Sequence, residues 1–223
     1  MAATMAQRIQ DLIGFDYSSN SINTENEAIE GAYAEVIDSL PEEVLLKYAV
    51  APKNLTIGKE EMAIDSKKII RVMRYDATPI ARVCEKLDIY EYVQAIADTN
   101  SIYYPTKFSP VYTEDPETTP PRLKVFPEIT GEAGVAESAK VWYTSYLNDS
   151  DVDGDDSFIG LPPEAENAVA LRASIHIMQT KISDTIQDDE DDEMLNMLNN
   201  QMQSLQKMYQ IEMMRLSGEK GEQ

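Results

Sequence analysis

Residues 161–180, LPPEAENAVALRASIHIMQT, decide the fold that this sequence predicts. Proline fits the first turn of a helix, where its missing N–H costs nothing, and glutamate is favourable near the positive end of the helix dipole. The apolar residues that follow recur every three or four positions, which is the helical spacing: Leu171, Ile175, Met178, Ile182 and Ile186. We therefore predict a long helix here, with alanines that allow close packing against other helices.

A second long helix is predicted at the C-terminal end, after the acidic run at residues 188–193 (DDEDDE). Its apolar seam follows a heptad-like spacing over two heptads, too few to establish a coiled coil. The seam consists of Leu195, Leu198, Met202, Leu205 and Tyr209. Six of the eleven methionines also lie here, and flexible thioethers suit adaptable contact surfaces. The seam is either core or the partner interface of a docking arm, and Gly218 ends the helix.

Three helices are predicted near the N-terminus. The first spans residues 4–14, with Thr4 as its cap and Gly14 as its stop, and residues 15–23 form a linker. A stronger helix begins at Thr24, which fits a capping box with Glu27. Pro41 ends that helix and begins the next one.

The middle of the chain changes to strand patterns, punctuated by prolines. Four strands are predicted at residues 67–75 (KKIIRVMRY), 109–113 (SPVYT), 122–126 (RLKVF) and 139–146 (AKVWYTSY). A short helix at 88–98 separates the first two, and a loop at 114–121 joins a hairpin.

The predicted fold class is therefore α+β and mainly helical: a helix bundle with an inserted small antiparallel β-sheet and a long C-terminal helix. We divide the chain into three parts. Residues 1–23 form a short helix and linker, and residues 24–187 form a helical domain with a β-rich insert at about 67–147. Residues 188–223 form an acidic linker and an amphipathic helical arm.

The chain is strongly acidic, with 19 basic and 40 acidic residues and a net charge of −21. Such a surface repels DNA phosphates and anionic lipid, so we expect no sequence-specific nucleic-acid binding. The charge is uneven, because the stretch from Lys47 to Lys86 holds nine basic and five acidic residues, leaving −25 for the remainder. This split either orients chains that stack positive face on negative face, or is ordinary surface scatter.

The sequence suggests no membrane association. The N-terminal segment lacks the apolar run of a signal peptide, and no stretch approaches the ~18 apolar residues of a membrane span. The single cysteine, Cys84, cannot form an intramolecular disulfide and is expected to be a small buried residue. We expect a soluble protein synthesised in a cytoplasm.

The motifs of catalysis are missing from the sequence, so we predict neither an enzyme nor a cofactor. The only histidine, His176, lies in a predicted helix, and the nine glycines form no phosphate-binding motif. Asp149, Asp151 and Asp153 match the first positions of an EF-hand calcium loop, but position 12 is Gly160 instead of glutamate. This loop is a candidate metal site with an incomplete match, and a solvated turn is the alternative. A metal-dependent hydrolase built on it is the remaining enzymatic interpretation.

Three segments together resemble a known family. They are residues 28–49 (AIEGAYAEVIDSLPEEVLLKYA), the strand-rich residues 67–146 and the helix at 161–180. In this order they resemble the head-to-tail connector proteins of tailed bacteriophages, also called adaptor or neck proteins, which form a ring beneath the portal. The C-terminal helix has no clear counterpart in that pattern and is interpreted as an arm that reaches a neighbouring subunit or the portal.

The resemblance implies a structural virion protein, synthesised in the host cytoplasm and located in the virion neck. It implies a cyclic homo-oligomer of twelve copies that extends the DNA channel, with the portal protein on one side and a stopper or tail protein on the other. The alternatives are another phage structural component, such as a stopper, tail-completion or baseplate protein, and an acidic interaction protein from outside a virus.

Overall fold

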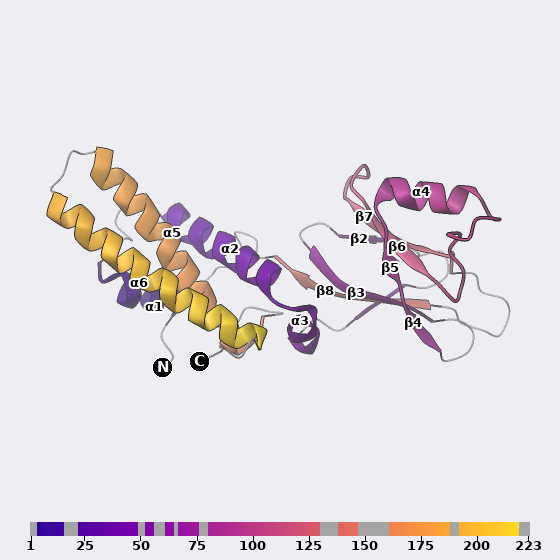
Figure 1. The fold of residues 1–223 in the computed structure, drawn as a ribbon, viewed down its shortest axis with the longest axis horizontal. Coiled ribbons are helices and arrows are strands. Elements are labelled where there is room, and N and C mark those ends of the chain that lie inside the picture. Colours follow the sequence, from indigo (N-terminus) through magenta and orange to yellow (C-terminus); the bar gives the residue numbers. More distant parts are fainter. Residues whose placement is uncertain are drawn as a thin grey trace. The chain divides into compact units, whose positions relative to one another are not determined.

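The computed structural model describes residues 4–15, 22–48, 52–55, 61–64, 67–75, 80–129, 138–146, 161–187 and 192–218. Two compact units make up the chain (Figure 1): a helical unit, Met1–Tyr48 with Tyr146–Gln223, and a β unit, Ala49–Ser145. The predicted fold class is confirmed, including the long C-terminal helix. Because the chain leaves the helical unit once and then returns to it, the β unit is an insertion.

The unit boundaries differ from the predicted division in two ways. The β unit begins at residue 49 instead of 67, because two short strands, β1 (Lys53–Leu55) and β2 (Glu61–Ala63), pair with later strands. Three residues are too few for an alternating pattern to be recognised in a sequence. The two terminal segments are not separate parts, since both belong to the helical unit.

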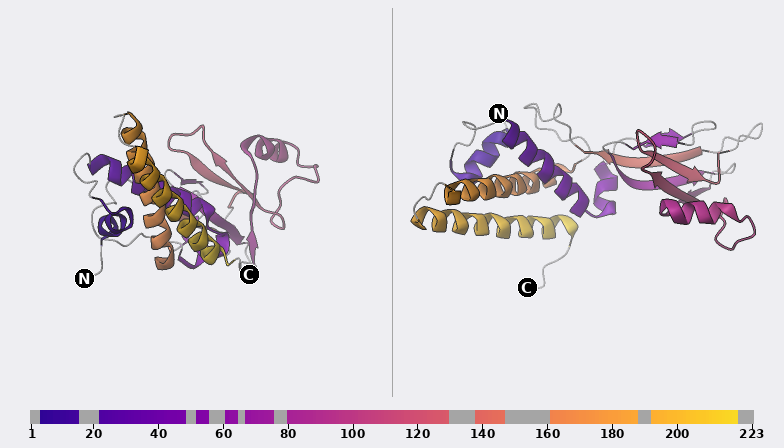
Figure 2. Two further views of the ribbon diagram at one scale, coloured as in Figure 1. Left: turned by 60° about the vertical axis from the view of Figure 1, so that its left-hand side comes forward. Right: turned by 90° about the horizontal axis from the view of Figure 1, so that it is seen from above.

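The helical unit is built around one central helix. It contains α1 (Met5–Ile13), α2 (Ile22–Ser39), the short α3 (Glu42–Tyr48), α5 (Glu166–Gln187) and α6 (Asp192–Ser217). Helix α5 packs against α1, α2 and α6, and Figure 2 shows α5 and α6 side by side. Most of the first half of α5 is buried, which is typical of a helix with neighbours on several sides. Its alanines, Ala168, Ala170 and Ala173, let those neighbours approach closely.

The helix ends follow local sequence signals, with one exception. The Thr4 side chain accepts a hydrogen bond from the Gln7 N–H at 3.2 Å, and Gly14 adopts the left-handed conformation that ends α1. Gly218 likewise has a positive φ after α6, as predicted. The predicted start of α2 at Thr24 is wrong, because the helix already begins at Ile22 and Thr24 lies inside it.

The β unit holds two four-stranded sheets instead of the single antiparallel sheet that the sequence predicted. Sheet A has the order β1-β8-β3-β4, with β3 (Lys67–Tyr75), β4 (Ala81–Val83) and β8 (Ser138–Ser145). Sheet B has the order β2-β7-β6-β5, with β5 (Glu85–Lys86), β6 (Val111–Asp115) and β7 (Arg122–Phe126). All strand pairs are antiparallel except β5 with β6. Each sheet has one apolar face, so two sheets bury what a single open sheet would expose.

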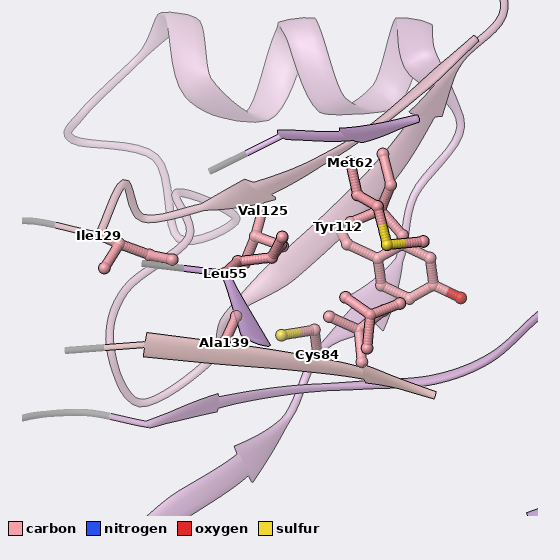
Figure 3. Close-up of a cluster of buried hydrophobic side chains, with 10 residues drawn as sticks. Leu55, Met62, Cys84, Tyr112, Val125, Ile129 and Ala139 are labelled. Carbon is pink, nitrogen blue, oxygen red and sulfur yellow. The ribbon is translucent and has the colours of Figure 1, made fainter. Parts of the chain in front are cut away.

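The core of the β unit lies where these apolar faces meet (Figure 3). Sheet A contributes Leu55, Val72, Ala139 and Val141, and sheet B contributes Met62, Tyr112, Leu123 and Val125. Helix α4 (Ile89–Ala97) packs beside β6, and Asp88 and Glu91 form a capping box at its start. The ring of Tyr92 on α4 contacts Phe126 edge-on at 6.3 Å between centroids. The helix predicted at 88–98 is thus confirmed.

Candidate partner-docking surfaces

The seam of α6 contributes to the core of the helical unit. Leu198 and Leu205 are only 4% and 1% exposed, on a helix that packs against α5. Leu195, Met202 and Tyr209 flank them and are half-buried. The prediction of a partner interface is therefore wrong for Leu198 and Leu205, since the chain itself covers their side chains. Heptad spacing indicates that one face of a helix is buried, but it does not indicate which helix buries it.

Polar contacts also fix α6 within the helical unit. The Gln201 Nε2 donates to the carbonyl oxygens of Leu12 and Ile13, at 3.2 and 2.8 Å. These two carbonyls belong to the last turn of α1, where carbonyl groups lack partners within the helix. Near the other end of α6, Arg215 donates to the Glu164 carbonyl at 3.4 Å. These contacts do not fit a freely protruding arm.

A polar cluster between α2, α5 and α6 accounts for the single histidine. Arg172 donates a hydrogen bond to Glu35, and its guanidinium lies 5.8 Å from the centre of the Tyr209 ring. That hydrogen bond lowers the pKa of Glu35, while burial raises the pKa of Tyr209. His176 Nε2 lies 3.3 Å from Glu35 Oε1, within ion-pair range. Sequence reasoning missed this cluster, because its members come from three separate helices.

This cluster does not form a nucleophilic site. Ser174 lies two residues before His176 on α5, and its side chain is buried. Its Oγ donates a hydrogen bond to the Ala170 carbonyl at 2.7 Å. Cys84 is buried in the β unit, and burial raises the pKa of its thiol to about 12. Neither Ser174 nor Cys84 is thus an activated nucleophile paired with the histidine.

The outer side of α6 exposes apolar side chains. Met197, Met208, Ile211 and Met214 are all exposed, with Ile211 the most at 66%. Met197 and Met208 are eleven residues apart, which is close to three helical turns, and Ile211 lies one turn further along the same side. The methionine-rich composition that suggested a contact surface therefore corresponds to this outer side. We call these four residues the α6 outer face.

The β unit exposes a second group of apolar side chains around α4 and the loop that follows it. This group, which we call the apolar tip, consists of Tyr90, Val93, Ile102, Tyr103 and Phe108. Ile102 is 90% exposed, and Arg82 and Lys107 place their cations 5.0 and 5.4 Å from the centre of the Phe108 ring. A cleft of about 780 Å³, lined partly by Tyr103 and Tyr104, opens beside the tip. Exposed apolar groups gathered in this way are typical of interaction sites.

Charge is divided between the two units. The helical unit carries seven basic and 26 acidic residues, a net charge of −19, whereas the β unit carries 12 basic and 14 acidic residues, a net charge of −2. The acidic character of the chain thus belongs almost entirely to the helical unit. The basic stretch found in the sequence, between Lys47 and Lys86, lies mainly in the β unit.

The sequence predicted a candidate metal site and no membrane span. The candidate calcium loop, with Asp149, Asp151 and Asp153, lies outside the described residues. Among the described residues, no three His, Cys, Asp or Glu side chains are grouped so as to hold a metal ion. None of the helices in the described ranges combines the length and apolar character needed to cross a membrane.

Comparison with protein-family models finds no matching family, and comparison with curated proteins finds no similar sequence.

Proposed function

We propose that this chain is a structural subunit that assembles into a ring between the portal and the tail of a phage virion. The observation that carries the proposal is that each unit has its own exposed apolar surface: the α6 outer face on the helical unit and the apolar tip on the β unit. One chain with two such surfaces can contact two different neighbours at once. A connector in a stacked assembly requires this property.

The order of elements supports this proposal. Helices α2 and α3, the inserted β unit and then α5 occupy the three segments that resemble the adaptor proteins. The resemblance implies twelve copies per ring, with the portal protein on one side and a stopper or tail protein on the other. Other structural proteins of a virion would use the same kinds of surface, so partner identity is what the experiment must decide.

The charge distribution supports passage of DNA through such a ring. Binding to DNA is driven largely by release of counterions when basic side chains neutralise phosphates. The helical unit has a net charge of −19, so it would gain little free energy from counterion release. A channel lined by this unit would let DNA slide without holding it.

The proposal is tested by measuring the mass of the purified chain, alone and after mixing with the portal protein encoded in the same genome. We expect a ring in solution, or a monomer that becomes a ring on the portal. A chain that stays monomeric and does not bind the portal would contradict the proposal. Assembly on a tail or baseplate protein instead of the portal would assign it to another position in the virion.

Substitutions then identify which surface contacts which partner. Ile102→Asp with Tyr103→Asp places charge in the apolar tip, and Met208→Asp with Ile211→Asp does so in the α6 outer face. Each double substitution should abolish the contact made by the surface that it changes, because an unpaired charge is costly to bury. Gln203→Asp, an exposed polar position on α6, is the matched control and should leave both contacts intact.

A further inference from the structure

The cleft beside the apolar tip is formed by three segments of the β unit. It has a volume of about 780 Å³, and strand β5, helix α4 and the loop at residues 98–110 all line it. Its lining includes Glu85 from β5, Glu91 and Gln94 from α4, and Tyr103 and Tyr104 from the loop. A concave site that combines aromatic surface with a few polar groups is the usual form of a binding site.

Hydrogen bonds within the loop hold the aromatic wall of the cleft in place. The N–H groups of Ser101 and Tyr104 donate to the carbonyl oxygens of Asp98 and Ser101, both at 3.0 Å. The ring of Tyr104 also packs edge-on against Phe126 on β7, with 5.7 Å between the ring centres. Tyr103 remains 77% exposed. Because this wall is formed before any ligand arrives, binding does not pay the entropy of ordering it.

The charge of the cleft is negative. Its lining holds two carboxylates, Glu85 and Glu91, and one cation, Lys86. Lys86 Nζ donates to Glu114 Oε1 at 2.8 Å, so the lysine charge is already balanced. Among the described residues, no basic side chain pairs with Glu85 or Glu91, and two nearby cations lie over the Phe108 ring, which does not line the cleft. The cleft therefore favours a positively charged group, to which its tyrosine rings offer cation–π contact.

The free edge of sheet B borders the same cleft. Strand β5 is the last strand in the order β2-β7-β6-β5. The N–H groups of Glu85 and Leu87 donate to the carbonyl oxygens of residues 110 and 112, at 3.0 and 2.9 Å. Because backbone groups alternate in direction along a strand, the N–H and C=O of Lys86 point away from β6. Lys86 therefore offers one backbone donor and one acceptor to an added strand.

We propose that this cleft binds an extended segment of a partner protein that carries a lysine or arginine side chain. The backbone of the segment pairs with Lys86 at the free edge of β5. Its cation is balanced by Glu85 and Glu91 and contacts the tyrosine rings. The proposal rests on the proposed function, because it identifies the chemistry of the partner that contacts the apolar tip.

An extended protein segment fits these features better than a free amine or nucleic acid does. A free organic cation can meet the carboxylates and the tyrosine rings, but it has no backbone to pair with β5. Nucleic acid would bring phosphates to a cleft whose negative charge is not balanced. Binding of a free cation as tight as that of a peptide, or binding of nucleic acid in the cleft, would overturn the proposal.

Synthetic peptides test the charge preference on the full chain. The probe is acetyl-TVRVT-amide, in which threonine and valine favour the extended conformation, and the reference peptide has glutamate in place of arginine. Each is titrated into the ¹⁵N-labelled chain, and the NMR shifts of the Lys86 amide and the Gln94 side-chain amide are followed. We expect the arginine peptide to bind roughly tenfold more tightly than the reference. Equal affinity, no binding, or shifts only outside the cleft would overturn the proposal.

Paired substitutions locate the charge that the peptide recognises. Glu85→Gln with Glu91→Gln removes both carboxylates, while glutamine can still cap α4. This variant should bind the arginine peptide roughly tenfold more weakly. Glu117→Gln with Glu128→Gln is the matched control, because both positions are exposed in the same unit and neither lines the cleft. The control should bind like the unmodified chain, and an equal loss in both variants would overturn the proposal. Circular dichroism establishes that each variant keeps its fold.

Two further probes test the backbone contact. The arginine peptide N-methylated at its three central residues keeps the charge but lacks their N–H donors. Agmatine carries a guanidinium group without a peptide backbone. Both should bind roughly tenfold more weakly than the arginine peptide, and equal binding of either would overturn the pairing with β5.

Portal binding and ring formation are measured separately from peptide binding. If the chain assembles on the portal but does not bind the arginine peptide, the cleft proposal alone fails. If the chain binds the peptide but neither assembles nor binds the portal, the proposed function alone fails.

Discussion

Glu35 receives a hydrogen bond from Arg172, which lies 137 residues away in the sequence, and this bond lowers the pKa of the carboxyl group from its ordinary 4.5. A lowered pKa in the folded state stabilises the protein above the unfolded-state pKa, and that stabilisation is lost as the pH falls through the folded-state pKa. Glu35→Gln should therefore lower the free energy of unfolding at about pH 7, with the difference from the unmodified chain shrinking towards about pH 3.

Urea titrations of both proteins at the two pH values provide the measurement. Glu43→Gln, an exposed position on α3, is the control and should shift the unfolding midpoint little at either pH. A constant difference between Glu35→Gln and the unmodified chain across the pH range would contradict the assignment, because the carboxylate charge would then contribute nothing.

A second prediction at the residue scale concerns the reactivity of Cys84. Its side chain lies in the core of the β unit, and its thiol has a pKa of about 12, so almost no thiolate is present at neutral pH. Because the thiolate is the reactive form, a disulfide reagent should modify Cys84 only after denaturant unfolds the β unit. Absorbance assays of reagent release check this. Rapid modification of the native chain would show that the β unit opens around Cys84.

Helix α6 has one buried and one exposed side, which predicts a sharp contrast between two substitutions three residues apart. Leu205→Ala removes a side chain that is 1% exposed and should destabilise the helical unit by about 2–5 kcal/mol. Met208→Ala, on the α6 outer face, should change stability by less than about 0.5 kcal/mol while weakening partner binding. Thermal unfolding measures both. Equal effects on stability would mean that the two sides of α6 are not distinct.

Elements with a long local pattern were predictable from the sequence, and those that depend on distant partners were not. The strands β3 and β7 match residues 67–75 and 122–126, because alternation over several residues fixes their face and length. Strands β1 and β2 have three residues each and exist through pairing with β8 and β7, so no local signal marks them. The seam of α6 was recognised as a buried face, but the sequence does not indicate that α5 buries it.

On the scale of the whole molecule, charge counts along the sequence predicted one basic stretch in an otherwise acidic chain, and the structure shows which unit holds each part. The basic stretch between Lys47 and Lys86 and the acidic remainder correspond largely to the β unit and the helical unit. What the sequence does not show is the register of β3 with β8, which brings Arg71, Lys140 and Trp142 to one face. Side chains about 70 residues apart become neighbours only through strand pairing.

Because the β unit is inserted between parts of the helical unit, deletion of residues 192–223 should unfold one unit and spare the other. Without α6, the side chains that cover one side of α5 are lost, including Leu198 and Leu205. The β unit should remain folded, since its core cluster is drawn entirely from residues 55–141. Such separate cooperative regions are expected of units with independent cores.

Amide hydrogen exchange read by mass spectrometry can follow both units in the same sample. In the truncated chain, peptides from α5 should exchange rapidly, whereas peptides from β3 and β8 should keep their native protection. A chain lacking only residues 219–223 is the control and should retain protection throughout. Persistent protection of α5 after the larger deletion would show that α5 does not need α6 for its stability, as expected if α6 is a docking arm. Loss of protection in β3 would instead show that the β unit depends on the helices for its stability.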